Sequence, residues 1–347
     1  MKIAIIGGGI VGETAAFYLA KQTNIQIDIY DDDWISGTKA AVGIICPWVN
    51  QRRNATWYKL VEQGANFYSK LIQDLGTDSF IKRSGCLVIN SNQHTKLLNI
   101  ALERAINNPI MGDVKEVTMT SMNTLIPESL SFDKAIDIPG AFQVDGNNLL
   151  KIFASVNNNI NRITSRVILT SLNTINSINY DYIVITAGAG LTDILKFDDF
   201  TFDFYSQKGM LLEYNYPPNN YRIIMPKGEI DILFNGTKLI VGASHENNYN
   251  NLEYNQNIAN QLITNATQYI DLPSEYTYRI GLRGHTSKNL PFYGPLNEYP
   301  NIIVAGGLGS SGLTSGPIIG YRIADYLINM TPFIDDETNP NLYIKNA

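Results

Sequence analysis

Short apolar runs that end in small residues recur along the chain. They cover residues 3–6, 181–185 and 301–305, and they lead into Gly7, Ala187 and Gly306. Continuous short apolar runs are typical of parallel strands that are buried on both faces. Because the carboxyl ends of parallel strands border one crevice in an open α/β sheet, we expect the small-residue loops to meet on one extended ligand.

Between these runs, polar and apolar positions alternate with the periods of helices and strands. Apolar residues at helical spacing predict helices over residues 13–22, 56–75, 94–106, 148–156 and 312–329. We expect Gly76 to end the second helix and Asn147 to cap the fourth. Short β-branched and aromatic runs predict strands over residues 25–30, 85–89, 114–119, 209–214, 221–225, 230–234 and 238–242.

The order of these elements predicts the α/β class and two discontinuous domains. Residues 1–84, 139–205 and 279–347 are expected to form a Rossmann-type nucleotide-binding domain around the buried strands. Residues 85–138 and 206–278 are expected to form a second, β-rich α+β domain over the ligand.

The first apolar run opens into a glycine motif. Gly7, Gly9 and Gly12 have the G-x-G-x-x-G spacing, which provides a tight turn, a close approach of backbone to pyrophosphate, and close packing of helix on strand. The helix that follows would turn its positive end toward the phosphates. Asp31 ends the next predicted strand, where a carboxylate accepts hydrogen bonds from a ribose 2′-hydroxyl. The sequence therefore predicts a dinucleotide site.

A long loop of small residues follows Asp31, where a simple nucleotide-binding unit would begin its next helix. The loop covers residues 32–48 and ends in Ile-Ile-Cys-Pro-Trp, which is unusual for an exposed loop. Small residues let the backbone approach a flat ligand closely. We expect this loop to line the ligand, and an exposed surface loop is the alternative.

Composition narrows the class of protein. Of 347 residues, 44% are hydrophobic and 17% are charged, as in an ordinary soluble globular protein, and the net charge of −6 argues against a nucleic-acid partner. The two cysteines, Cys46 and Cys86, are too few for a disulfide framework or a zinc cluster, which suits a reducing compartment. No apolar run is long enough to span a bilayer, so we expect a cytoplasmic protein. The sequence leaves open whether the protein forms a homo-oligomer.

Five segments, in order, carry a resemblance to a known family. They are Gly7-Gly8-Gly9-Ile10-Val11-Gly12, Gly37-Thr38 with Ala40-Ala41-Val42-Gly43-Ile44-Ile45, Val241-Gly242-Ala243-Ser244-His245-Glu246, Gly281-Leu282-Arg283 through Thr286, Pro291 and Gly294, and residues 307–314. Together they resemble the glycine oxidase and D-amino-acid oxidase family of FAD-dependent amine oxidoreductases. This resemblance implies a glutathione-reductase-like FAD-binding domain with an inserted substrate domain.

The resemblance also implies how FAD lies along the chain. Adenosine would lie near Asp31 and Val167, the pyrophosphate on residues 9–12, and the isoalloxazine between residues 43–45 and residues 309–313. The implied cofactor contacts are Gly7, Gly9, Ile10, Val11, Gly12, Asp31, Thr38, Lys39, Ala40, Gly43, Ile44, Ile45, Val167, Ala187, Gly188, Gly307, Gly309, Ser310, Ser311, Gly312, Leu313 and Thr314.

Elementary physics supports the last of these contacts independently. A helix that begins near Gly312 presents free N–H groups and a positive dipole end, which would stabilise negative charge on reduced flavin and raise its reduction potential. A helix cap by Ser310 or Ser311 is the alternative. The C-terminal segment lacks the cysteine that links flavin in the sarcosine oxidase kind, so FAD is expected to be non-covalent. A link through Cys46 stays open.

Arg283 is the predicted substrate-binding residue. A planar guanidinium pairs bidentately with a carboxylate, and the resemblance implies that an arginine at this motif position binds the carboxylate of an amino acid. Arg279 is a competitor, and a structural salt bridge is the alternative role for Arg283. Gly284 and Lys288 depart from the family's proline and aspartate. Tyrosines such as Tyr205, Tyr221 and Tyr293 are candidates for hydrogen bonds to substrate.

The resemblance implies hydride transfer from the α-carbon of glycine, sarcosine or a D-amino acid to flavin N5. The resulting imine hydrolyses, and oxygen or another electron acceptor reoxidises the flavin. No acid or base is assigned, because His94, His245 and His285 form no catalytic or metal-ligand pattern. The alternatives are a nicotinamide-dependent dehydrogenase with one Rossmann domain and a non-catalytic FAD-binding regulatory protein.

Overall fold

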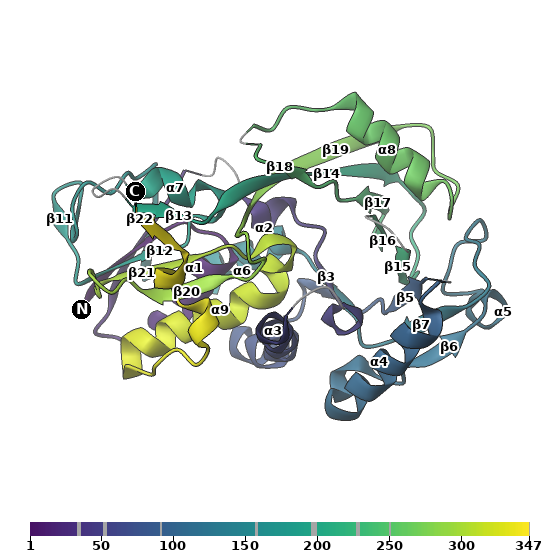
Figure 1. Ribbon diagram of the computed structural model, residues 1–347, viewed down its shortest axis with the longest axis horizontal. Coiled ribbons are helices and arrows are strands. Elements are labelled where there is room, and N and C mark those ends of the chain that lie inside the picture. Colours follow the sequence, from purple (N-terminus) through teal and green to yellow (C-terminus); the bar gives the residue numbers. More distant parts are fainter. Residues whose placement is uncertain are drawn as a thin grey trace.

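The computed structural model describes residues 1–32, 36–50, 54–90, 92–156, 159–195, 200–226, 230–249 and 251–346 (Figure 1). Part of the predicted ligand-lining loop, residues 33–35, lies outside the described residues. Within these ranges, no helix has the length and apolar character that crossing a membrane requires.

A six-stranded sheet forms one half of the molecule. Its order is β20 (Phe292–Pro295), β21 (Ile302–Gly306), β12 (Tyr182–Ile185), β1 (Lys2–Ile6), β2 (Gln26–Asp31) and β9 (Ile160–Thr164). All neighbours pair in parallel except β20 and β21. The strands β1, β12 and β21 are adjacent, so the small-residue loops that follow them lie at one edge of the sheet. The prediction that these runs share a sheet is confirmed.

Helices from distant parts of the chain pack beside this sheet. They are α1 (Ile10–Leu19), α3 (Ala55–Leu75), α6 (Gly146–Val156) and α9 (Gly312–Asn329). Glycines allow two of the crossings to be close. A Cβ on Gly320 of α9 would lie 2.5 Å from the carbonyl oxygen of Val11 in α1, and one on Gly64 of α3 would lie 2.1 Å from that of Thr314 in α9.

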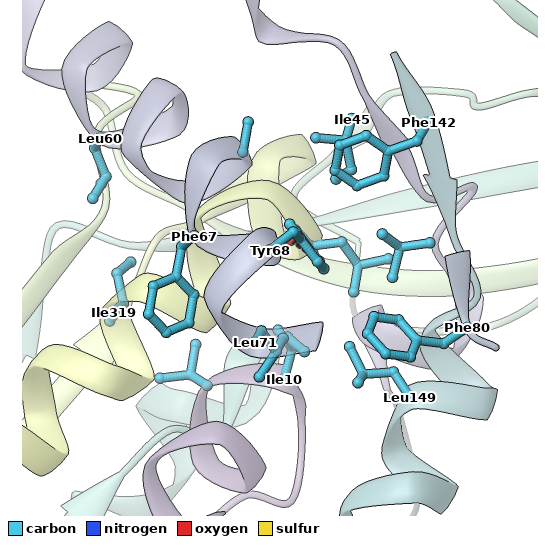
Figure 2. Packing of buried hydrophobic residues seen from close by; sticks show 14 of the residues in the cluster. Ile10, Ile45, Leu60, Phe67, Tyr68, Leu71, Phe80, Phe142, Leu149 and Ile319 are labelled. Atoms are coloured by element: carbon cyan, nitrogen blue, oxygen red, sulfur yellow. Dashed lines mark hydrogen bonds between the residues drawn. The ribbon is translucent and has the colours of Figure 1, made fainter. Parts of the chain in front are cut away.

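The core between these helices is dominated by aromatic and aliphatic side chains (Figure 2). Tyr68 of α3 is fully buried, its ring lies edge-on to Phe142 at 5.3 Å, and its hydroxyl donates to the carbonyl of Leu313 at the start of α9. Figure 2 also shows Phe67 of α3 on the side of Ile319 of α9. The N-terminus of α9 is thus held by a polar contact inside an apolar core.

A nine-stranded sheet forms the other half. Its order is β18 (Glu246–Asn247), β14 (Tyr205–Asn215), β17 (Lys238–Gly242), β16 (Asp231–Asn235), β15 (Ile223–Pro226), β5 (Cys86–Ile89), β7 (Ala135–Ile138) and β6 (Lys115–Val117), with β19 (Tyr276–His285) also on β14. Figure 1 shows β14 and β19 extending from the region of the first sheet toward α8 (Gln256–Ala266). The face under α8 carries one apolar cluster, and the opposite face joins the cluster of the first half.

Smaller elements complete the fold. A three-stranded sheet joins β3 (Ile44–Ile45), β8 (Phe142–Val144) and β4 (Ile81–Lys82), and two-stranded sheets join β10 (Thr174–Ile175) to β11 (Ile178–Asn179) and β13 (Phe200–Phe202) to β22 (Ile344–Asn346). The remaining α-helices of the described residues are α2 (Gly37–Ala40), α4 (His94–Asn107), α5 (Met119–Met122) and α7 (Leu191–Ile194).

Several element boundaries differ from the sequence predictions. The first helix begins at Ile10, before the predicted start at residue 13, because Gly9 is extended and its carbonyl already accepts from Glu13. The helix predicted over residues 148–156 begins at Gly146, so Asn147 is not its cap. Instead, the carboxylate of Asp145 accepts from the amide of Asn148. The strand predicted over residues 114–119 is shorter, because Thr118 starts a helical turn with a capping box.

Candidate functional site

A cavity of about 1030 Å³ lies between the two large sheets. Its walls include the residues at the carboxyl ends of β1, β12 and β21, the α2–β3 segment, and one face of the nine-stranded sheet. This volume reaches the upper end of the usual range for ligand pockets, about 300–1,000 Å³. The cavity therefore has room for a long ligand and a second small molecule.

The start of α1 forms one end of the cavity. Gly9 precedes the helix and has no side chain to cap it, and Gly9, Ile10 and Val11 all line the cavity, so the first turn of α1 faces the cavity. The carboxylate of Asp31 accepts from the amide of Gly8, and the buried hydroxyl of Thr38 accepts from the amide of Ile10 at 3.0 Å. These contacts shape the turn, and the exposed helix end suits the pyrophosphate of a dinucleotide.

The start of α9 forms a second helix end on the same cavity. The hydroxyl of Ser311 donates to the carbonyl of Leu308, and no side chain caps the helix. The alternative of a simple cap by Ser310 or Ser311 is therefore wrong. Gly309 adopts a φ of +56°, and a Cβ there would lie 2.5 Å from the ring of His285. The glycine lets the turn pack against the ring of His285, and the turn itself lines the cavity.

The α2–β3 segment provides the facing wall. Gly43 has a φ of +83°, and a Cβ there would lie 2.1 Å from the carbonyl oxygen of Val144. The following strand β3 pairs with β8, which holds Ile44 at the cavity. The described part of this loop lines the cavity, and its contact with a ligand stays a prediction.

Most of the predicted cofactor contacts lie on this one cavity. They are Gly7, Gly9, Ile10, Val11, Asp31, Thr38, Ala40, Gly43, Ile44, Val167, Ala187, Gly188, Gly307, Gly309, Ser310, Ser311, Gly312, Leu313 and Thr314. Sequence segments more than 300 residues apart thus meet on one surface, as a single extended ligand requires.

Three predicted cofactor contacts lie behind the cavity wall. A Cβ on Gly12 would lie 2.1 Å from the carbonyl oxygen of Gly7, so this glycine serves helix–strand packing. Ile45 is fully buried in the core. Lys39 does not line the cavity, and its amide donates to the hydroxyl of Ser36.

The predicted substrate tyrosines also lie off the cavity. Tyr221 packs edge-on against Phe234 at 5.2 Å, on the α8 side of the nine-stranded sheet. Tyr205 stacks on His285 at 5.6 Å. Neither tyrosine is among the residues that line the cavity. Tyr293 is also buried elsewhere, against Arg322.

Arg283 lines the cavity from β19. Its Nη2 donates to the carbonyl of Ser244 at 2.7 Å, and burial lowers the pKa of its guanidinium to about 10. No carboxylate of the described residues forms an ion pair with it. A buried cation without a counter-charge is costly. Its role in binding a substrate carboxylate stays a prediction.

Arg279 has a different environment although it lies on the same strand. Its Nη2 is 3.1 Å from the carboxylate of Glu213 on β14, and its Nη1 donates to the carbonyl of Lys39. Arg279 does not line the cavity. A structural salt bridge was the alternative role for Arg283, but it is Arg279 that forms one.

The departures from the family motif have local explanations. A Cβ on Gly284 would lie 2.2 Å from the ring of Phe204, so no larger residue fits there. The ammonium of Lys288 lies 4.8 Å from the centroid of the Tyr343 ring. Neither departure displaces Arg283 from the cavity.

Sequence reasoning missed several polar and apolar residues on the cavity. Asp231, Met225 and Leu211 reach it from three strands of the nine-stranded sheet, and burial raises the pKa of Asp231 to about 7. His245 also lines the cavity, with its Nδ1 3.2 Å from the amide oxygen of Gln207. The only available signal was the carboxylate at the start of an otherwise apolar strand.

Both cysteines are buried and reduced. Cys46 lines the cavity, while Cys86 is enclosed in β5. Burial and the neighbouring Cys46 thiol raise the pKa of Cys86, so it stays protonated at neutral pH.

Comparison with known proteins identifies the family of this chain. The family model described as DAO, FAD-dependent oxidoreductase, matches residues 2–326. The chain belongs to this family. The oxidoreductase is therefore an FAD-dependent enzyme, and a nicotinamide-dependent dehydrogenase with one Rossmann domain is excluded.

Relatives of the oxidoreductase share its whole length. It is 28% identical to the uncharacterized oxidoreductase YurR of Bacillus subtilis (strain 168), over 95% of this chain and 96% of that protein. Among solved structures, the iminodiacetate oxidase IdaA of Chelativorans sp. BNC1 is similar with a TM-score of 0.90 and 25% identity, over 97% and 98% of the two chains. Glycine oxidase of Geobacillus kaustophilus shares the fold with a TM-score of 0.83 at 19% identity, over 97% of each chain.

Proposed function

We propose that this oxidoreductase oxidises the C–N bond of a small amino acid, such as glycine, sarcosine or a D-amino acid. The observation that carries the proposal is Arg283, a partly buried cation on the cavity with no carboxylate partner among the described residues. A substrate carboxylate would supply the missing charge and form bidentate hydrogen bonds. The names of the similar structures, iminodiacetate oxidase and glycine oxidase, support the same class of substrate.

The chain's own residues would act chiefly by binding and positioning. The N-terminus of α1 and Asp31 would hold the nucleotide end of FAD, and the N-terminus of α9 would stabilise negative charge at the flavin end. FAD, when bound, accepts a hydride from the substrate. Arg283 would fix the distance of the α-carbon from the flavin by holding the carboxylate, which is the largest catalytic contribution we assign to the protein.

We further propose that FAD is held without a covalent bond. The only cysteine on the cavity among the described residues is Cys46, whose neighbour is the Cys86 thiol. Denaturation should therefore release all of the yellow chromophore into the supernatant. Colour that stays with the precipitated chain would contradict this proposal.

We also propose the domain division predicted above, with residues 1–84, 139–205 and 279–347 binding FAD and residues 85–138 and 206–278 forming the substrate domain. Its support is that the six-stranded sheet draws its strands from the first set, and most of the nine-stranded sheet comes from the second. The strand β19 extends from residue 276 to residue 285 and connects the two sets.

The test is an anaerobic screen of flavin reduction with glycine, sarcosine, and D- and L-amino acids. We expect at least one of them to bleach the flavin of the purified yellow protein. Arg283→Ala should weaken the binding of that substrate by about 10-fold to 100-fold or more, because hydrogen bonds between charged groups contribute about 1.5–3 kcal/mol.

Arg279→Ala is the matched control, because it removes the same group from the same strand outside the cavity. It should leave the substrate affinity unchanged. A protein that binds FAD but is reduced by no amino acid would overturn the proposal, as would equal effects of the two arginine substitutions.

A further inference from the structure

Asp231 faces the cavity from the first position of β16. Along this strand, Ile232 belongs to the apolar cluster under α8, whereas Leu233 belongs to the cluster on the opposite face. Because side chains alternate along a strand, Asp231 shares the face of Leu233 and points toward the other half of the molecule. Strand alternation and the residues that line the cavity therefore place Asp231 on the same side of the sheet.

Apolar side chains of the described residues lie on the same part of the cavity as this carboxylate. Met225 and Leu211 line the cavity from neighbouring strands, and the Cys86 thiol lies close enough for Asp231 to influence it. No hydrogen bond or ion pair to the Asp231 carboxylate is present among the described residues, and burial alone raises its pKa to about 7. An isolated carboxylate in such a place has a large desolvation penalty that a cation or an N–H donor would offset.

The pairing of the strands relates Asp231 to Arg283. Asp231 lies opposite Gly242 on β17. Ser244 follows Gly242 by two residues, and its carbonyl holds the guanidinium of Arg283 at 2.7 Å. With strands about 4.8 Å apart and a rise of about 3.3 Å per residue, the two charged groups are on the order of 10 Å apart. A small amino acid with a hydrogen bond at each end spans a gap of this order.

We propose that Asp231 binds the amino group of the substrate whose carboxylate Arg283 holds. The inference rests on the proposed function and adds a second anchor to it. Arg283 recognises the anion and Asp231 recognises the nitrogen, so the pair selects α-amino acids over acids of the same shape that lack a basic nitrogen. Two anchors also fix the orientation of the bond between the α-carbon and nitrogen, which one anchor leaves free to rotate.

The test compares amino acids with matched hydroxy or methoxy acids in the FAD-loaded protein. The pairs are glycine with glycolate, sarcosine with methoxyacetate, and D-alanine with D-lactate, and the pair used is the one whose amino acid reduces the wild-type flavin. Dissociation constants of the nitrogen-free acids come from perturbation of the oxidised flavin spectrum. Those of the amino acids come from the concentration dependence of anaerobic reduction.

Asp231→Asn keeps the shape of the side chain and removes its charge. We expect it to raise the dissociation constant of the amino acid by about 10-fold to 100-fold, the usual range for a hydrogen bond between charged groups. The dissociation constant of the matched acid should stay within about 2-fold of the wild-type value. Arg283→Ala should weaken the binding of both the amino acid and its matched acid. Asp113→Asn, which neutralises an exposed carboxylate on the edge of the nine-stranded sheet, is the control for a change of net charge and should weaken neither.

Equal loss of both ligands in Asp231→Asn, or no loss of either, would overturn the inference. If Asp231→Asn fails to retain FAD, Asp231→Glu provides the second variant, with the same selective loss expected because the longer side chain displaces the carboxylate. A wild-type flavin that no amino acid reduces would instead overturn the proposed function, so the two failures are distinguishable.

Discussion

At the scale of single residues, the site depends on how Arg283 is held. Its guanidinium lies over Gly209 of β14, where a Cβ would be only 2.6 Å from Nη2 and 3.4 Å from the carbonyl oxygen of Ser244 that accepts its hydrogen bond. The absence of a side chain at position 209 is therefore part of the carboxylate site, although Gly209 itself has no reactive group.

Gly209→Ala tests this arrangement. The added methyl group should displace the guanidinium of Arg283. The affinity for carboxylate ligands should then fall by about 10-fold or more, the loss expected when one charge-assisted hydrogen bond is broken. Spectral titration of the oxidised flavin with glycolate measures the effect. In the Arg283→Ala background the same substitution should have little further effect, because the group it displaces is gone. Additive losses would show that Gly209 acts by another route.

At the scale of secondary-structure elements, the helix crossings fix the position of the N-terminus of α9. The close approach of α3 to α9 at Gly64 brings Tyr68 under the first turn of α9, where its hydroxyl holds the carbonyl of Leu313. Packing between elements that are far apart in sequence thus sets the direction of the N–H groups at the cavity.

Gly64→Ala should lower the free energy of unfolding by about 1–3 kcal/mol, because the methyl group would overlap the backbone of α9. This is opposite in sign to the gain of about 1 kcal/mol that alanine gives over glycine in an exposed helix. Urea unfolding of the apoprotein measures it. Ser69→Ala, at an exposed position of the same helix, is the control and should change stability by less than about 0.5 kcal/mol. A stabilised Gly64→Ala protein would contradict the close crossing.

At the scale of the whole molecule, the cavity lies between the two sheets and takes its walls from both. Residues 7, 44, 188 and 309 belong to the side of the six-stranded sheet, and residues 209, 225 and 231 belong to the nine-stranded sheet. A cofactor in this position contacts both halves, so its binding energy contributes directly to holding them together.

FAD should therefore raise the midpoint of thermal unfolding in a concentration-dependent way. A ligand that binds only the native state at 100 times its dissociation constant stabilises it by about 2.7 kcal/mol, which corresponds to several degrees. Differential scanning calorimetry of the apoprotein over a range of FAD concentrations measures this. Adenosine monophosphate, which lacks the flavin end and should bind more weakly, should give a smaller rise at equal concentration. A midpoint that FAD leaves unchanged would show that FAD does not bind the native protein.

Local sequence determined the parts of the site that depend on consecutive residues. The apolar runs and the glycines after them predicted parallel strands and their small-residue loops, because strand burial and tight turns impose their pattern on neighbouring positions. Gly7 could thus be placed at the end of a strand from its motif alone, whereas Gly43 and Gly309 were expected on the ligand because of the family resemblance, and all three line the cavity.

The tertiary structure decided what depends on pairing across the chain. Arg279 and Arg283 are indistinguishable by pattern, and only the pairing of β19 with β14 places one beside Glu213 and the other on the cavity. The register of β16 likewise turns Asp231 inward, whereas Tyr221 lies on the opposite face. Such contacts join residues tens to hundreds of positions apart, so no local pattern records them, and strand register alone determines which side chains meet.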